Sequence, residues 1–330
     1  MTEMTPIADG WSGSREHVRW GAVGLFVLIS FGLAWLVMLP AWLSGGLQNP
    51  FFTVMASAMM FTPLIATFIV SAVMKVPGRP RLRALGWWPL RPVGRFLTML
   101  AIGLFGTMVL ALVAMGVAVA FGWLHIDVDH SAFAVSITSA VPKGTPLPPL
   151  ALLAVLQLVN VPIGAVINSF LTVGEETGWR GFLLPALRPL GTWPSLLLSG
   201  AIWGLWHAPV ILLGYNFNRP NLAGLGLMVL GCMATGTWLG WLRMRSGSIW
   251  PGVLAHGTLN AIARLPLLLA STALPADPAL MSTLGASGVI VFVIVAVILT
   301  VTRQMRWVEA SAPSPVSPEP IRPPVATAPH

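Results

Sequence analysis

Long apolar stretches separated by short polar segments run along almost the whole chain. A helix needs about 20 consecutive apolar residues to cross the hydrocarbon core of a membrane. Stretches of this kind lie at 20–43, 51–74, 96–123, 163–187, 195–214, 222–242, 248–268 and 284–302. The pattern therefore predicts an all-α, polytopic membrane protein with about eight transmembrane helices.

One apolar run, from 149 to 187, is too long for a single crossing, because it would extend roughly 58 Å as a straight helix. Pro162 lacks a backbone N–H and its ring clashes with the preceding turn. We therefore expect a break at Pro162 and a separate short helix over 150–161. The first run, 20–43, exceeds the apolar core of about 7–15 residues found in cleaved signal peptides, so we expect it to be retained as an anchor.

The composition narrows the class of protein further. Of the 330 residues 56% are hydrophobic and only 8% are charged, against roughly 25% charged in an ordinary soluble domain. A soluble enzyme, a disordered chain and a secreted disulfide-rich scaffold are excluded. The single cysteine, Cys232, has no partner within the chain, so it also excludes intramolecular disulfides and multi-cysteine metal sites.

The basic residues predict the orientation in the membrane. The formal net charge is +8, and Lys and Arg accumulate in the cytoplasmic loops of membrane proteins. With the N-terminus inside, the basic residues left on the outer side are Lys143, Arg219 and Arg264. We therefore expect a multi-pass protein of the cell membrane with both termini in the cytoplasm. The positive charge is then explained by the cytoplasmic loops of a protein whose partner is the lipid bilayer. No nucleic-acid partner is expected.

These segments suggest a division of the chain into five parts. We expect a cytoplasmic N-terminal tail at 1–19, followed by N-terminal transmembrane helices and loops at 20–149. A catalytic helical core at 150–270 and a last transmembrane helix at 271–307 come next. The chain is expected to end in a disordered, Pro-rich cytoplasmic tail at 308–330.

The ionisable residues within the apolar segments are few. Of the ten acidic residues only Glu175 and Glu176 fall inside such a segment, and of the six histidines only His207 and His256 do. Counted from the cytoplasmic ends of their helices, Glu175 and both histidines lie at a similar depth of roughly 16–20 Å. Ionisable groups inside a membrane are costly and usually functional, so the common depth predicts a single site.

Two spacings within this region support the same site. His256 and Asn260 are four residues apart and share a helix face, so that both side chains can point into one cavity. Glu176 and Arg180 are also four residues apart, with the acid first, which is the better order for an ion pair. This pair would neutralise Glu176 and leave Glu175 free for chemistry.

The same residues resemble the motifs of a known family. The run from Glu175 to Gly181, EETGWRG, is similar to the EExxxR motif of the CAAX-protease and bacteriocin-processing (CPBP, or Abi) membrane proteins. WGLWH, from Trp203 to His207, resembles their FxxxH motif with Trp in place of Phe, and HGTLN from His256 resembles their HxxxN motif. Order and rough spacing agree over residues 150–270. We expect Trp203 to be a packing wall over the site.

The resemblance implies a helical intramembrane endopeptidase with a cavity open to the cytoplasm. Eukaryotic relatives cleave the last three residues from prenylated CAAX proteins, and bacterial relatives are associated with bacteriocin maturation or self-immunity. The partner implied for this chain is a membrane-associated peptide or protein substrate, lipidated substrates included.

Peptide hydrolysis needs a base that activates water and donors that hold the oxyanion. We expect Glu175 to activate the water together with His207, and His256 and Asn260 to hold the oxyanion. Glu176 belongs to the same site, with Arg180 and Trp203 as structural support. In this version of the chemistry no cofactor is required.

Other interpretations remain open at this point. Glu175, His207 and His256 form the ligand set of a His₂Glu zinc protease, and although no HExxH sequence is present, the residues permit zinc without requiring it. A proton-coupled transporter also uses buried Glu and His residues, but its polar residues would be expected along the full membrane thickness rather than at one level. A non-catalytic scaffold that binds partner helices is a further alternative.

Overall fold

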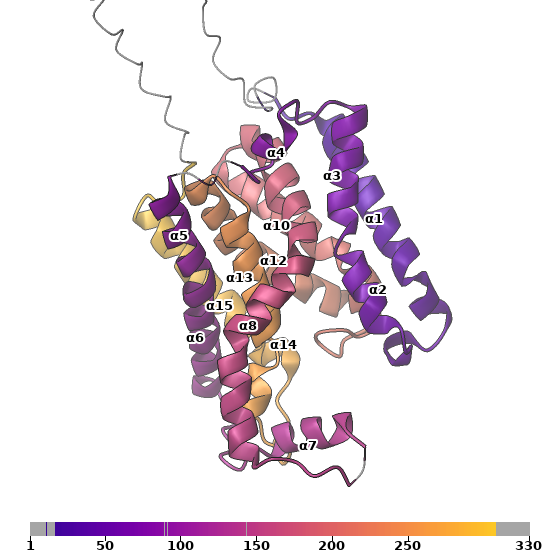
Figure 1. Ribbon diagram of the computed structural model, residues 1–330, viewed down its shortest axis with the longest axis vertical. Helices are drawn as coiled ribbons and strands as arrows, with labels where there is room; N and C mark the ends of the chain where they lie inside the picture. The colour runs from indigo at the N-terminus through magenta and orange to yellow at the C-terminus, as the bar shows by residue number, and fades with distance from the viewer. Residues whose placement is uncertain (1–10, 12–16, 89, 91, 143, 308–330) are drawn as a thin grey trace, which may run out of the picture.

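A computed structural model describes residues 11, 17–88, 90, 92–142 and 144–307. These residues form helices and loops, without a strand among them (Figure 1). The tail expected at 308–330 and most of the tail expected at 1–19 lie outside the described residues.

Each apolar stretch contains helical structure. The N-terminal part comprises α1 (Trp20–Leu43), η2 (Gly46–Gln48), α2 (Phe52–Met59), α3 (Thr62–Val73), α4 (Arg81–Ala84), α5 (Val93–Ala101), η3 (Ile102–Gly106), α6 (Thr107–Ala120) and α7 (Ser131–Ala140). The C-terminal part comprises α8 (Leu150–Glu176), η4 (Thr177–Leu183), α9 (Leu184–Leu187), η5 (Arg188–Leu190), α10 (Thr192–Trp206), α11 (Ala208–Ile211), α12 (Leu222–Ser246), α13 (Trp250–Ile262), η6 (Leu265–Leu268), α14 (Pro278–Met281) and α15 (Ala286–Val301).

Within the described residues, 6 helical segments are long and apolar enough to cross a membrane: Trp20–Leu43, Phe52–Val73, Val93–Ala120, Leu150–Leu190, Leu222–Ser246 and Pro278–Val301. The prediction of an all-α, polytopic membrane protein is confirmed. The expected stretches 195–214 and 248–268 correspond mainly to α10 and α13. These helices have 15 and 13 residues, which by length alone is too short for them to count as membrane-spanning helices. The number eight stays a prediction.

The expected helix break at Pro162 is wrong. Helix α8 continues through Pro162 to Glu176, and α13 packs along it. The two backbones approach so closely that a Cβ at Gly257 would lie 2.4 Å from the carbonyl oxygen of Ala165. A proline inside a membrane helix is tolerated where neighbouring helices compensate the lost hydrogen bond. Packing against α13 thus overrides the local preference of the proline.

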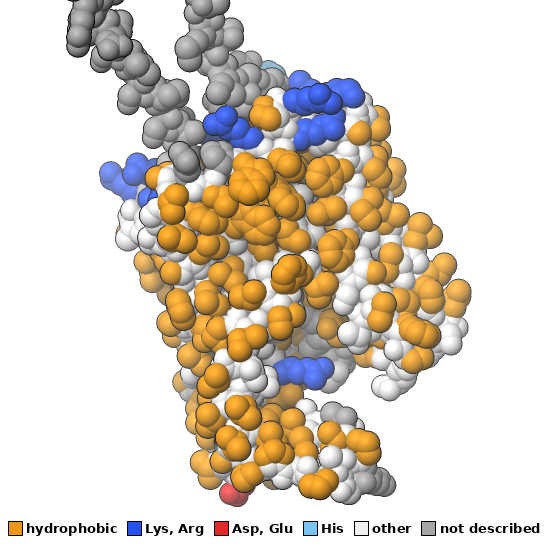
Figure 2. Space-filling view, viewed as in Figure 1, with side chains coloured by type: hydrophobic (Ala, Val, Ile, Leu, Met, Phe, Trp, Pro, Cys, Tyr) orange, Lys and Arg blue, Asp and Glu red, His pale blue; other side chains and the backbone are white. Residues whose placement is uncertain are grey.

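The surface of the molecule is largely apolar, as expected for lipid contact. Figure 2 shows hydrophobic side chains over most of the visible face, while Lys and Arg side chains gather at the end near α4 and the start of α5. Large side chains such as Leu28, Phe170 and Val301 are exposed. The charge distribution fits a membrane protein with one basic end, and its orientation stays a prediction.

Candidate active site

The two adjacent glutamates lie where α8 passes into the π-helical turn η4. π-helical turns are rare in proteins, and those that do occur are often found at functional sites. Both carboxylates are buried, Glu175 with 2% and Glu176 with 0% of its surface exposed. Glycines bring the start of α3 against this turn, since a Cβ at Gly178 would lie 2.3 Å from the Cβ of Pro63. The turn is therefore a tightly enclosed segment.

Glu176 is held by two basic side chains. Its Oε1 accepts a hydrogen bond from the guanidinium of Arg180 at 2.8 Å and lies 2.9 Å from Nδ1 of His256. The ion pair between Glu176 and Arg180 is thereby confirmed. The second oxygen, Oε2, is buried without a hydrogen-bond partner among the described residues, and a Cβ at Gly252 would lie 3.3 Å from it. Glu176 is thus fixed on one side and closely packed on the other.

Glu175 is oriented by two tryptophans. Its Oε2 accepts hydrogen bonds from the indole N–H of Trp203 at 2.7 Å and of Trp179 at 3.3 Å. Its Oε1 accepts no hydrogen bond from the described residues. Unlike Oε2 of Glu176, this oxygen is not completely enclosed by the protein. One oxygen of this carboxylate is therefore fixed, and the other remains available.

The two histidines each direct Nδ1 to a fixed acceptor. Half-buried His207 lies between α10 and α11, with Nδ1 2.9 Å from the carbonyl oxygen of Trp203. Because a carbonyl only accepts hydrogen bonds, Nδ1 carries the proton and Nε2 of the neutral ring is an acceptor. In buried His256, Nδ1 is directed to the carboxylate of Glu176. In both rings Nε2 is left for other partners.

Trp203 is the common contact of the cluster. The ring of Trp203 lies under Arg180, whose Cζ is 4.3 Å from the ring centroid. Its centroid lies 5.3 Å from that of His256 and 5.8 Å from that of His207. Together with the hydrogen bond to Glu175, these contacts bring residues from α8, η4, α10 and α13 to one place.

Asn260 is not part of these contacts. It lies on α13 one turn after His256, as the spacing requires, but it is exposed and its amide makes no hydrogen bond within the described part of the chain. The helix face is the expected one, whereas a contact with the other site residues is absent in this arrangement.

Sequence reasoning missed the roles of two tryptophans and one histidine. Trp203 was expected to be a packing wall, but its indole N–H also binds Glu175. Trp179 lies four residues after Glu175, and that spacing was the available signal for its contact. The pairing of His256 with Glu176 joins residues 80 positions apart, and nothing in the local sequence indicates it.

The arrangement of the possible ligands bears on the zinc alternative. Among the described residues, no group of three His, Cys, Asp or Glu side chains is arranged to hold a metal ion. Nδ1 of His256 is directed to Glu176, and the fixed oxygen of Glu175 is held by indole N–H groups. Glu175, His207 and His256 are thus not gathered as a ligand set in this arrangement, although Oε1 of Glu175 and Nε2 of both rings are left available.

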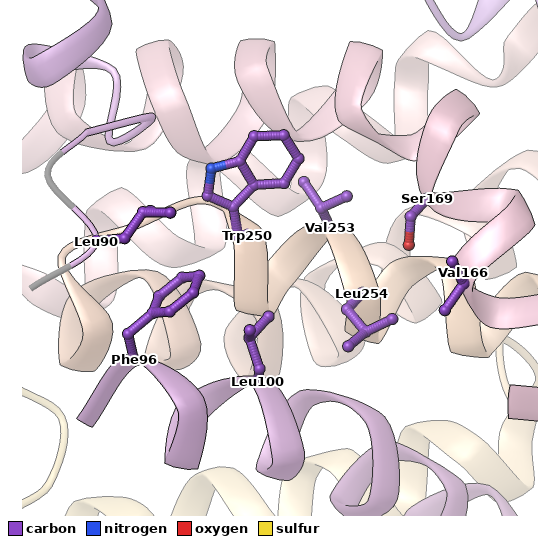
Figure 3. A pocket seen from close by; sticks show the side chains of 8 residues that line it. All are labelled: Leu90, Phe96, Leu100, Val166, Ser169, Trp250, Val253 and Leu254. Atoms are coloured by element: carbon purple, nitrogen blue, oxygen red, sulfur yellow. The ribbon is translucent and has the colours of Figure 1, made fainter. Parts of the chain in front are cut away.

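An apolar pocket of about 340 Å³ lies between α5, α8 and α13 (Figure 3). The side chains that line it come from α5, α8, α13 and the segment before α5: Leu90, Phe96, Leu100, Val166, Ser169, Trp250, Val253 and Leu254. Its wall is joined to the site, since Thr172, one turn before Glu176, donates a hydrogen bond to the carbonyl oxygen of Val253 at 2.9 Å. The helices that carry Glu176 and His256 thus also form this pocket.

Comparison with known proteins finds the same segment of the chain. Residues 148–262 match the family described as Type II CAAX prenyl endopeptidase Rce1-like. CAAX prenyl protease 2 of Methanococcus maripaludis is 25% identical over 142 residues, and the match covers 34% of this chain and 51% of that protein. The chain thus spans about half the length of this curated relative. The family resemblance of the motifs is confirmed for residues 148–262.

Proposed function

We propose that this protein is an intramembrane endopeptidase that hydrolyses a peptide bond of a membrane-associated protein or peptide. The observation that carries the proposal is the buried carboxylate of Glu175, with one oxygen fixed and one available, which binds Trp203, whose ring in turn contacts the imidazoles of His207 and His256. Support comes from the match of the surrounding segment to the CAAX prenyl endopeptidase family. Lipidated substrates are included because the curated relative is named a prenyl protease.

In the proposed reaction Glu175 is the general base. Its available Oε1 takes a proton from a water molecule, which attacks the carbonyl carbon of the scissile peptide bond. Nε2 of His207 accepts a hydrogen bond from the same water and orients it, because Nδ1 of this ring is already bound to the Trp203 carbonyl. The proton on Glu175 then passes to the leaving amine as the C–N bond breaks. The products are a carboxylic acid and an amine, and transfer of the remaining proton between them gives the carboxylate and the ammonium form.

His256 is the proposed oxyanion donor. With Nδ1 directed to Glu176, its ring can donate from Nε2 only as an imidazolium, which carries both protons. The carboxylate of Glu176 is positioned to stabilise that cation. With His256 charged, Glu175 and Glu176 are balanced by Arg180 and His256, so the buried cluster carries no net charge. Asn260, one turn further along α13, would supply the second donor once substrate is bound.

The apolar pocket between α5, α8 and α13 is the proposed place for the hydrophobic part of the substrate. Its lining is almost entirely aliphatic and aromatic, and it shares α8 and α13 with the carboxylates and His256. A lipid chain or an apolar side chain bound there would be held by the same two helices that carry Glu176 and His256. We place the entrance on the cytoplasmic side, in line with the basic residues, and require no metal for the chemistry.

The transporter alternative has less support. A proton path through the membrane needs ionisable groups at successive depths, and the buried acids among the described residues are Glu175 and Glu176. Two adjacent carboxylates at one level suit a reaction site better than a path.

The proposal is tested by comparing membrane peptides from cells that express the wild type or Glu175→Gln at equal levels. Wild-type cells should contain shortened forms of a small set of membrane-associated proteins, and the variant should contain the uncleaved forms. Identical peptide sets in the two strains would contradict the proposed function.

A further inference from the structure

Trp203 has a donor that a packing residue would not need. Its side chain is 2% exposed, and its indole N–H makes the shorter of the two hydrogen bonds to Glu175, 2.7 Å against 3.3 Å from Trp179. Both donors bind the same oxygen, Oε2. The bond from Trp203 therefore helps to decide which oxygen of Glu175 is fixed and which is available.

Trp203 also orients the neighbouring histidine. Its backbone carbonyl accepts the hydrogen bond from Nδ1 of His207 at 2.9 Å. One residue thus contacts both partners of the proposed water activation, through its N–H on one side and its carbonyl on the other. The atoms that these contacts leave available are Oε1 of Glu175 and Nε2 of His207.

The backbone of α10 is fixed around Trp203. A Cβ at Gly200 would lie 2.7 Å from Cα of Met233, and a Cβ at Gly204 would lie 2.5 Å from Cα of Val229. These glycines flank Trp203 and allow α10 to pack directly on the backbone of α12. Because α10 has no room to move toward α12, the indole is held in a defined place.

We infer that Trp203 is a positioning residue for the proposed hydrolysis, and that it acts through its indole N–H on Glu175. The inference rests on the proposed function. Trp203 is not proposed to contact the reacting atoms. It holds the carboxylate so that Oε1 faces the water which His207 orients.

The test must separate the N–H from the ring, because the ring also stacks on Arg180 and contacts His256. Trp203→Phe keeps an aromatic ring at the position and removes the donor. Incorporation of 3-benzothienylalanine in place of Trp203 keeps the full size of the indole and also lacks the N–H. Trp238→Phe is the matched control, since its buried indole N–H binds Thr107 at 2.9 Å, away from Glu175.

The assay is cleavage of a farnesylated, fluorescence-quenched CAAX-type peptide by purified protein in liposomes. Loss of a hydrogen bond to a charged group corresponds to about a 10- to 100-fold effect. We expect Trp203→Phe and the benzothienyl protein to lower kcat by this factor, with KM changed less than about twofold and an unchanged melting temperature. Trp238→Phe should keep the kcat of the wild type.

A second measurement needs no substrate. In protein labelled with 5-fluorotryptophan, the ¹⁹F signal of Trp203, assigned by its loss in Trp203→Phe, should shift on Glu175→Gln. The signal of Trp238 should not shift. This response reports the contact between the indole and the carboxylate whatever the protein's activity.

The outcomes are distinct. A wild-type kcat in either Trp203 replacement, or a Trp203 signal that ignores Glu175→Gln, overturns the inference. A loss in Trp203→Phe that the benzothienyl protein does not share assigns the effect to ring shape and also overturns it. If the wild type cleaves no peptide while the Trp203 signal responds to Glu175→Gln, the proposed function fails and the positioning contact stands.

Discussion

Replacement of Glu175 by glutamine exchanges a single oxygen for an amide nitrogen. In the structure, Oε2 accepts hydrogen bonds from Trp203 and Trp179, so the carbonyl oxygen of glutamine would take that place and its NH₂ group the place of Oε1. The side chain keeps its volume and its indole contacts but loses the basic lone pair. Hydrolysis should fall by the roughly 10²- to 10⁴-fold assigned to general base catalysis, and the protein should remain folded.

The same exchange at Glu176 should act on stability. Arg180 and His256 both contact Oε1 of Glu176, and Arg180 has 3% of its side chain exposed. Glu176→Gln leaves the guanidinium without its carboxylate, and the loss of one partner of a buried ion pair costs about 3–5 kcal/mol. We therefore expect a lower melting temperature or yield, with activity falling as a consequence.

The measurement is hydrolysis per folded molecule for both variants, with thermal stability recorded on the same samples. Activity is normalised to the folded fraction, which separates a lost base from a lost ion pair. If Glu175→Gln cleaves like the wild type while Glu176→Gln is stable and inactive, the base has been assigned to the wrong carboxylate.

Three further expectations follow from the arrangement. Gly252→Ala places a Cβ 3.3 Å from Oε2 of Glu176 and should lower the activity or the melting temperature. Gly116→Ala is the control, because its Cβ meets no atom within 4 Å, and it should change neither quantity. Equal behaviour of the two variants would refute the close packing. Reporter fusions should give a cytoplasmic signal at residue 85 and an external one at residue 135, and the reverse result would overturn the orientation. Purified protein should contain well under one zinc per chain and keep its proteolysis in chelators; stoichiometric zinc with chelator inhibition would restore the His₂Glu mechanism.

Contacts within one helix could be predicted from the sequence. Glu176 and Arg180 lie one turn apart, so helical geometry alone brings them together, and the structure contains the ion pair. The apolar stretches likewise predict most helix positions, because the membrane demands long apolar helices. The common depth of Glu175, His207 and His256 along their helices likewise assigns them to one group without reference to the packing.

Contacts between helices could not be predicted in this way. The path of α8 through Pro162 depends on its packing with α13, and the bond from Trp203 to Glu175 depends on how α10 lies against α8. The sequence shows that a tryptophan stands at position 203, but it does not show where its N–H points. Asn260 shows that a shared helix face does not by itself produce a contact. It lies one turn after His256 but makes no hydrogen bond to the other site residues in the described part of the chain.

The π-helical turn Thr177–Leu183 makes the chain unequally tolerant of changes in length. A π turn winds an additional residue into the helix, so removal of one residue lets the backbone relax into α-helical geometry while α8 and α9 keep their places. An inserted residue cannot be accommodated by a comparable change of helix type, because the turn already contains the additional residue. The position of a deletion also matters: before Arg180 it would rotate the guanidinium away from Glu176, whereas after Arg180, at Phe182 for example, it would leave the ion pair intact. Single-residue length variation in this family segment is therefore expected downstream of Arg180 and as loss rather than gain.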